Sequence, residues 1–195
     1  KTKKSGLRYD LKRGEKDLFK LGELNFFKIE NQSDAVNELP AFIKMLRLRE
    51  KQVKRTSSIE YYIDQESVYL NYLNLIWDHI SFSKLTLNDK VIAYHFGFEY
   101  DKKLYWYKPT FDINYIKFSP GKILIKKAME NAYKNNFQEL DFLLGDEPYK
   151  FQWAKQTRKN FGFVFGTNNI KSRLFFKWFS IIKPNLKSFI KKLKQ

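Results

Sequence analysis

The stretch that decides the fold runs from Lys117 to Trp153. Residues 117–133 read KFSPGKILIKKAMENAY, and residues 139–153 read ELDFLLGDEPYKFQW. A Ser-Pro-Gly turn at 119–121 directly precedes an amphipathic helix, and an aromatic strand, Leu104 to Lys108, precedes the turn. Unpaired backbone N–H groups at the start of such a helix, together with the positive end of its dipole, form a receptor for phosphate. The stretch therefore predicts that the chain binds a phosphorylated cofactor.

Three strand patterns lead up to this stretch at hairpin spacing. Ser83 to Leu87 is joined to Val91 to Glu99 by a three-residue turn, and a second tight turn leads to Leu104 to Lys108. After the helix at 121–135, Glu139 to Leu144 reads as a further strand. A helix that joins two strands in this way implies a parallel or locally splayed pair. The pattern predicts an α/β fold whose mixed central sheet combines an antiparallel meander with one βαβ crossover.

The N-terminal third is predicted to be mainly helical. Helical periodicity is present in residues 5–20, in residues from 33 or 34 to about 53, and in residues 65–80, and a strand pattern occupies residues 23–30. At the other end, residues 161–165 are a further strand candidate. A basic amphipathic segment then runs from Lys171 to the end, interrupted at Pro184.

Composition narrows the class of protein. The 195 residues are 43% hydrophobic and 18% aromatic, as in a folded globular domain. The absence of cysteine excludes disulfides, thiolate metal sites and cysteine nucleophiles, and two histidines are too few for an imidazole zinc site. We therefore expect no metal. No apolar run approaches the roughly 20 residues of a membrane span, so the expectation is a cytoplasmic domain.

The net charge of +16 is concentrated at the two ends of the chain. Residues 1–20 hold eight basic and three acidic side chains, and residues 171–195 hold eight basic and no acidic ones. The middle is nearly balanced, whereas a domain that reads nucleic acid more often carries its charge on the folded face. This distribution indicates ends that solvate or tether the chain.

Four sequence blocks resemble the GNAT acyltransferases, and more specifically their CelD/BcsL branch. They are VIAYHFGF (91–98), LYWYKPTFD (104–112), FSPGKILI (118–125) and FLLGDEPYKFQW (142–153), in the family's order and spacing. GDEPYK after a Ser-Pro-Gly turn is the most specific part. The resemblance implies a GNAT-like acyltransferase domain at residues 22–170, between a basic helical linker at 1–21 and a basic amphipathic helix at 171–195.

The resemblance also implies an activity. GNAT enzymes transfer an acyl group from acetyl-CoA or another acyl-CoA, here to an amine or hydroxyl of a small-molecule or glycan acceptor such as a sugar or cell-envelope precursor. The CelD/BcsL branch is related to the FemAB enzymes, so aminoacyl transfer from charged tRNA is an alternative. A non-catalytic lobe that binds a partner or a membrane is another. The helix at 5–20 is similar to the linker between two GNAT-like lobes, which implies an upstream lobe.

The candidate cofactor residues lie at the turn itself: Phe118, Ser119, Gly121 and Lys122. The widespread GNAT phosphate loop is Arg/Gln-x-x-Gly-x-Gly/Ala, whereas this turn has a single glycine and a proline that lacks an N–H group. We therefore expect the Ser119 hydroxyl and the Lys122 ammonium to supply the missing donors. The alternative is an ordinary helix start in which serine and proline act only as caps.

Polar groups concentrate after the last predicted strand, where α/β proteins gather their sites. Asp146 is a candidate general base, Tyr149 is a candidate acid for the departing thiolate, and Lys150 is a third catalytic candidate. Asp141 and Glu147 are candidate substrate contacts, and Glu147 is a second possible base. The structural alternative is that the two acids after Gly145 act as caps, Tyr149 packs, and Lys150 pairs with Asp141.

Three residues of the meander complete the candidate site. His95 alternates onto the same strand face as Gly97, and it is a candidate general base if that face opens into the acceptor cleft. The alternative is a core histidine. Tyr107 and Asp112 are candidate substrate contacts near the mouth of the site.

The segment from Lys171 onward interleaves aromatic and aliphatic residues with lysines, as interfacial membrane helices do. Each basic residue near anionic lipid contributes roughly 1 kcal/mol, so eight suffice for peripheral binding. The expectation is that this segment meets an anionic membrane surface or docks on a protein partner.

Overall fold

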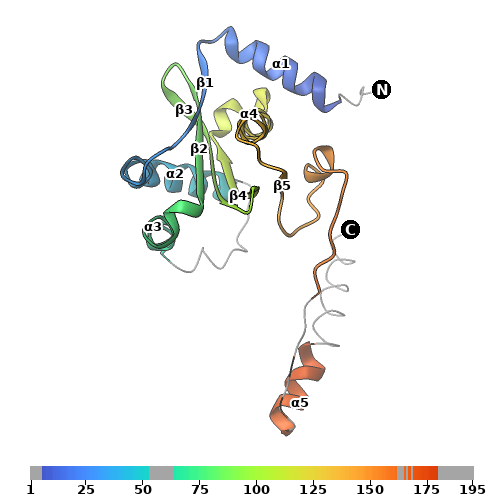
Figure 1. Ribbon diagram of the computed structural model, residues 1–195. Helices are drawn as coiled ribbons and strands as arrows, with labels where there is room; N and C mark the ends of the chain where they lie inside the picture. Colours follow the sequence, from blue (N-terminus) through green and yellow to red (C-terminus); the bar gives the residue numbers. More distant parts are fainter. Residues whose placement is uncertain (1–5, 53–63, 162–164, 166, 168, 180–195) are drawn as a thin grey trace. The chain divides into compact units, whose positions relative to one another are not determined.

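The computed structural model describes residues 6–52, 64–161, 165, 167 and 169–179 (Figure 1). The chain forms two compact units, Lys1–Trp153 and Ala154–Gln195. The helices are α1 (Leu7–Phe19), α2 (Gln32–Gln52), α3 (Gln65–Ile76), α4 (Pro120–Lys134) and α5 (Ile170–Lys177), with the short 3-10 helices η2 (Trp77–His79), η3 (Ile113–Phe118) and η4 (Lys150–Gln152). The strands are β1 (Leu24–Lys28), β2 (Ile80–Leu87), β3 (Lys90–Tyr100), β4 (Lys103–Phe111) and β5 (Glu139–Asp141).

One five-stranded sheet in the order β1-β2-β3-β4-β5 forms the centre of the first unit. Strands β1 to β4 pair antiparallel, and the two hairpin turns place Asn88, Asp89, Asp101 and Lys102 at positive φ, as tight hairpins require. Strand β5 returns through α4 and pairs parallel with β4. The predicted mixed sheet, with its meander and single βαβ crossover, is confirmed.

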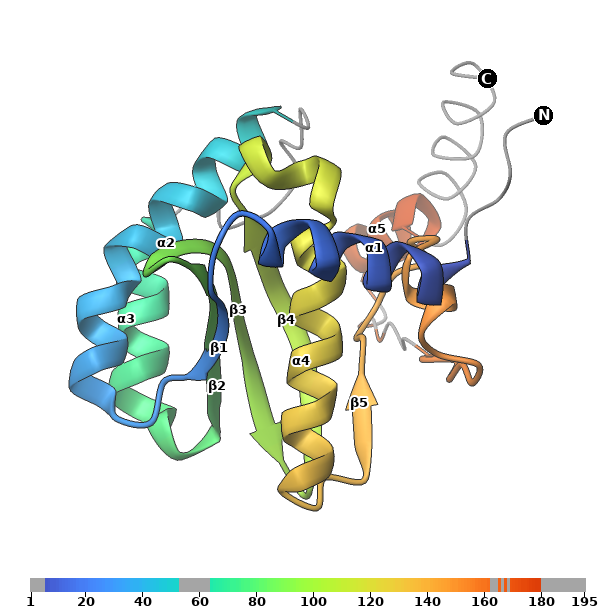
Figure 2. The same cartoon turned by 90° about the horizontal axis from the view of Figure 1, so that it is seen from above.

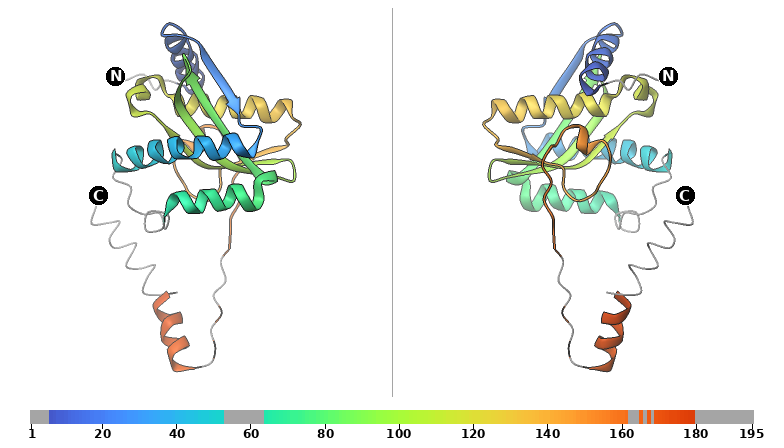
Figure 3. Two further views of the ribbon diagram at one scale, coloured as in Figure 1. Left: turned by 90° about the vertical axis from the view of Figure 1, so that its left-hand side faces the viewer. Right: turned by 90° about the vertical axis from the view of Figure 1, so that its right-hand side faces the viewer.

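The sheet has helices on both faces, as Figure 2 shows: α2 and α3 cover one face, and α4 covers the other, with α1 crossing α4. On the α2/α3 face, Phe42 packs edge-on against Tyr69 at 5.2 Å between ring centroids and against Phe82 at 5.5 Å. On the opposite face, α4 buries Ile123, Leu124 and Ala128. The views in Figure 3 show the same layers from two sides. The core therefore lies in two layers, one on each side of the sheet.

Two predicted boundaries differ from the structure for local reasons. The strand predicted at 139–144 ends at Asp141, whose side chain accepts a hydrogen bond from the Leu143 N–H at 2.7 Å and turns the chain, with Leu143 at φ 58°. The helix predicted at 65–80 ends at Ile76 and continues as η2, and β2 begins at Ile80 rather than Ser83. The predicted strand at 161–165 and the segment 180–195 with Pro184 lie largely or wholly outside the described residues.

Among the described residues of the second unit, the regular secondary-structure element is α5. None of the described residues of this unit is buried. Across all the described ranges, no helix is both long enough and apolar enough to pass through a bilayer.

Candidate active site

The predicted cofactor and catalytic segments meet at one edge of the sheet. In a right-handed crossover the helix starts where its first strand ends, and it finishes where the second strand begins. The first turn of α4 therefore lies at the carboxyl ends of β4 and β5, as Figure 2 shows. Three segments lie at this edge: the turn at 118–122, Asp112 after β4, and the loop at 141–150 after β5.

Beside this edge, β4 and β5 separate. Strand β5 pairs with β4 only at Lys103, Leu104 and Tyr105, whereas β4 continues to Phe111. The edge of β4 from Trp106 onward is therefore not paired with β5. A strand edge of this kind presents backbone N–H and C=O groups to a ligand that lies between the two strands. Pro109 is an exception, because it has no N–H and its carbonyl oxygen accepts from Arg49 Nη1 at 2.8 Å.

A β-bulge in the pairing of β3 with β4 lies at the point where β4 begins to separate from β5. Phe96 pairs with Lys108 and Phe98 pairs with Tyr105, so Trp106 and Tyr107 together face Gly97. A Cβ at Gly97 would overlap the Tyr105 carbonyl oxygen, so the bulge depends on glycine there. Bulges bend a strand and redirect its side chains. The bulge was not predicted, although an isolated glycine in a strand pattern was a signal for it.

The turn before α4 offers two donors that face no partner among the described residues. Ser119 has φ 57° and makes no side-chain capping bond. Its carbonyl oxygen accepts from the N–H groups of Lys122 at 2.9 Å and Ile123 at 3.2 Å, and Pro120 has no N–H, so the Gly121 N–H and the Ser119 hydroxyl remain. The end of β4 approaches the turn closely at Gly121, because this residue has no side chain. An added Cβ would lie only 3.3 Å from the Phe111 ring.

The ammonium group of Lys122 forms an ion pair with α1. Its Nζ lies 2.8 Å from Oδ2 of Asp10 on α1, and one helical turn later Lys126 pairs with Glu15 at 2.7 Å. Helix α1 reaches so close because Gly14 has no side chain: a Cβ there would overlap the Phe118 carbonyl oxygen. Asp10 thus holds the Lys122 ammonium, whose role at the cofactor stays a prediction, and α1 forms a wall of the turn.

Lys117 is the exposed cation next to the turn, and the sequence analysis did not single it out. Its Nζ lies 4.9 Å from the centroid of the Phe118 ring, which is half-buried. The position could have been found from the sequence, because Lys117 opens the stretch quoted at the outset.

In the loop after β5, some polar residues make structural contacts and others are exposed. Lys150 is buried, and its Nζ lies 2.7 Å from the Leu144 carbonyl oxygen and 2.8 Å from Oε2 of Glu147. It therefore pairs with Glu147 and connects two parts of the loop from inside. Asp141 holds the turn described above. Asp146, in contrast, is exposed.

Tyr149 is half-buried in the same loop. Its ring packs edge-on against Phe142, with centroids 6.2 Å apart and planes at 84°. This contact fixes the orientation of the Tyr149 ring. The residue lies in the loop after β5, at the edge of the sheet where β4 and β5 separate.

His95 lies in the core and not at an open face of the sheet. It is fully buried, and its ring stacks on Trp106 with centroids 3.8 Å apart and planes at 5°. Burial lowers the pKa of His95 to about 3, and the Tyr105 backbone opposes only part of this shift. A histidine without solvent access cannot take a proton from an acceptor, so the condition for its role as base is not met.

The other two meander candidates have structural contacts. Tyr107 is half-buried on the α2/α3 face, 5.4 Å from Phe98 between ring centroids. Asp112 accepts the Asn114 N–H at 3.0 Å at the start of η3, and it lies 3.3 Å from Lys90 Nζ. The hydrogen bond to Asp112 raises the pKa of Lys90.

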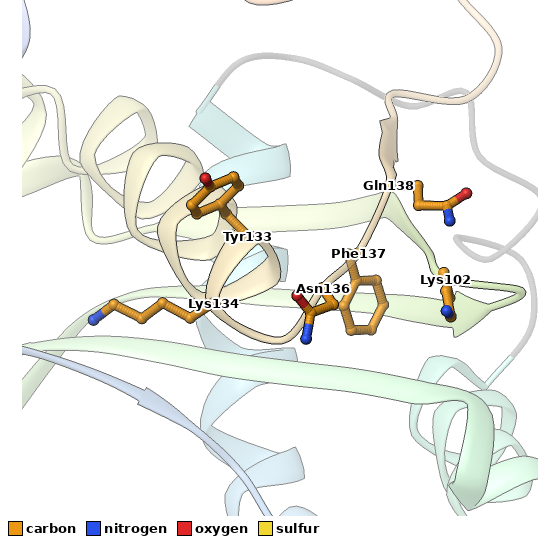
Figure 4. A pocket seen from close by; sticks show the side chains of 6 residues that line it. All are labelled: Lys102, Tyr133, Lys134, Asn136, Phe137 and Gln138. Carbon is orange, nitrogen blue, oxygen red and sulfur yellow. The ribbon is translucent and has the colours of Figure 1, made fainter.

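An open depression of about 720 Å³ lies at the other end of α4 (Figure 4). It is lined by Lys102, Tyr133, Lys134, Asn136, Phe137 and Gln138. None of the predicted site residues is among them, and we do not assign the active site there.

Comparison with known families decides the identity of this arrangement. The model of the family described as acetyltransferase (GNAT) domain matches residues 5–151. The chain belongs to the GNAT acetyltransferase family. Its GNAT domain therefore includes α1, and the acyltransferase class expected from the four sequence blocks is confirmed. No curated protein matches the chain.

Solved structures confirm the GNAT fold. An aminoglycoside acetyltransferase from an uncultured soil metagenomic sample, solved with sisomicin, is 18% identical with a TM-score of 0.51, over 74% of this chain and 97% of that one. A possible acetyltransferase from Clostridium difficile 630 is 14% identical with a TM-score of 0.54, over 74% and 99%. A ribosomal-protein-alanine N-acetyltransferase from Brucella melitensis biovar Abortus 2308 is 10% identical with a TM-score of 0.52, over 74% and 100%.

Proposed function

We propose that this GNAT domain transfers an acetyl group from acetyl-CoA to an amine or hydroxyl on a sugar-like or cell-envelope acceptor. One observation carries the proposal: β4 and β5 separate directly beside the first turn of α4. The turn would hold the cofactor phosphates through the Gly121 N–H, the Ser119 hydroxyl and Lys117. The open edge of β4 would pair with the extended remainder of the cofactor.

Acetyl-CoA supplies the activated thioester. A backbone N–H on the edge of β4 would polarise the thioester carbonyl, which is the electrostatic contribution that acyl transfer needs most. Asp146, exposed at the edge where the strands separate, would remove the acceptor proton, and Tyr149 would donate a proton to the leaving sulfur. The acceptor nitrogen or oxygen then bonds to the acetyl carbon as the carbon–sulfur bond breaks.

Calorimetric titration with acetyl-CoA tests the binding step. We expect micromolar affinity, weakened about tenfold by Lys117→Glu, because the change replaces an attractive charge at the phosphates by a repulsive one. Lys134→Glu, at the opposite end of α4, is the matched control and should leave the affinity unchanged. A folded chain that does not bind acetyl-CoA would refute the proposal.

The transfer step is open to a direct assay. The chain contains no cysteine, so a thiol reagent reports only the CoA released. Amino sugars, aminoglycosides, polysaccharide precursors and peptide amines form the acceptor panel. Asp146→Asn should bind acetyl-CoA normally but lose about 10²-fold or more in kcat, as expected for a general base. An unchanged kcat in this variant would assign the base elsewhere.

A further inference from the structure

Helix α5 and the two residues that follow it, Trp178 and Phe179, present large apolar side chains on their surface. Leu174 is 63% exposed, Phe175 58% and Trp178 48%. The Phe175 ring stacks on Phe179 at 5.9 Å between centroids and lies 6.4 Å from Trp178, so the rings form one continuous cluster. An amphipathic helix normally buries such a cluster on a core. The described part of the second unit provides no buried residue for this purpose.

The charge of the second unit is entirely of one sign. Residues 154–195 contain eleven Lys/Arg and no Asp/Glu, so all of the acidic residues of the chain lie in the first unit. On α5 itself, Arg173 and Lys177 are one helical turn apart. Each is two positions from a ring of the stacked pair, Phe175 and Phe179, so the two cations form a basic row on the side of the helix away from that pair. A surface that combines exposed rings with unopposed cations needs a partner with both apolar and anionic parts.

We propose that the second unit docks on an anionic lipid surface, with the rings of α5 among the acyl chains and Arg173 and Lys177 at the lipid phosphates. A bilayer offers both parts at once. A nucleic acid would neutralise the cations but would leave Leu174 and Ile170 in water. A protein groove would cover the rings but would have to match a unit without any acidic residue. Helix α5 spans only about 12 Å, far less than the ~30 Å hydrocarbon core, so it lies along the surface.

Flotation of the full chain with vesicles tests this inference. We expect binding to phosphatidylcholine vesicles that contain about 30% phosphatidylglycerol, at least tenfold tighter than to phosphatidylcholine alone, and weaker when the salt rises from about 0.05 M to about 0.5 M. The double variant Arg173→Gln/Lys177→Gln should lose roughly fivefold per charge. Lys44→Gln/Lys134→Gln removes the same charge from exposed positions of the first unit and should bind like the unaltered chain.

A second pair of variants separates lipid from other polyanions. Leu174→Ser/Phe175→Ser should lower vesicle affinity and abolish the blue shift of Trp178 emission on binding, whereas Tyr133→Ser, which removes an exposed ring on α4, should do neither. Because the chain has four tryptophans, Trp178 emission is taken as the difference between each chain and its Trp178→Phe counterpart. Equal binding to both vesicle types, or sensitivity to the charge variant without sensitivity to the ring variant, overturns the proposal. So does Trp178 emission that is already blue-shifted without vesicles, since the chain itself would then cover α5. Acetyl-CoA affinity is not involved in any of these outcomes.

Discussion

His95 shows how one residue can be read in opposite ways from sequence and from structure. Strand alternation places it correctly on the face of Gly97, but alternation does not say whether that face is covered. Helix α4 covers it, and within the described residues neither ring nitrogen of His95 makes a hydrogen bond of regular distance and angle, although the Tyr105 backbone lies close enough to act on its pKa. The imidazole therefore stays neutral in the folded chain and contributes to stability through its stacking on Trp106.

This burial makes the stability of the first unit depend on pH. The pKa of His95 falls from 6.5 to about 3 on folding, so below pH 6.5 the unfolded chain binds a proton that the folded chain does not. The free energy of unfolding should fall, through this residue, by up to about 1.4 kcal/mol per pH unit as the pH is lowered. Urea unfolding at about pH 7 and about pH 5 measures the difference. His95→Phe, which keeps a flat ring on Trp106, should reduce it, whereas the exposed His79→Phe should not. Identical slopes in all three proteins would contradict the assignment.

Residue identity alone predicted the site unevenly. The turn at 118–121 could be predicted because proline, glycine and serine fix backbone geometry locally. The partners of Lys122 and Lys150 could not, since Asp10 lies more than a hundred residues from Lys122, and Glu147 and Asp141 are both acids within ten residues of Lys150. Charged side chains choose partners by tertiary proximity, which a single sequence does not encode in its spacing.

At the scale of elements, α1 behaves as a part of the GNAT domain. It contacts α4 through two ion pairs and meets the end of η3 at Gly14. The sequence predicted this helix and its basic character, and on helix propensity alone Gly14 would only weaken it. The structure shows a close backbone approach instead, which is the other common reason for a glycine in a helix.

Gly14→Ala tests that approach. Alanine favours an isolated helix by about 1 kcal/mol over glycine. Here, however, the added Cβ would overlap the Phe118 carbonyl oxygen, so we expect a net loss of about 1–3 kcal/mol in the free energy of unfolding. Acetyl-CoA affinity should fall as well, since Phe118 leads into the turn. Gly6→Ala, where a Cβ would meet nothing within 4 Å, is the control. A Gly14→Ala chain more stable than the original would show that α1 does not press on the turn.

At the scale of the whole molecule, the boundary between the two units, after Trp153, is also the point after which the chain has no acidic residue. The first unit contains the sheet, both core layers and all of the acidic residues. The order of strands followed from hairpin spacing and the βαβ rule, which are local signals. The bulge at Gly97 and the separation of β4 from β5 did not, because both depend on how the strands pack.

A chain ended after Trp153 should keep the first unit intact. We expect cooperative thermal unfolding within a few degrees of the full chain, since none of the described residues removed by the truncation is buried. Circular dichroism gives the midpoint, and calorimetry gives the acetyl-CoA affinity, which should be unchanged. A chain that unfolds far earlier would mean that the second unit packs on the first.

The short pairing of β5 with β4 also has a consequence for solubility. Six residues of β4, from Trp106 to Phe111, extend beyond the last pair with β5. An uncovered strand edge is a template on which a second chain can add a strand. The domain should therefore self-associate most readily when no ligand lies along this edge, and a ligand seated there would act as its capping strand and keep the protein monomeric.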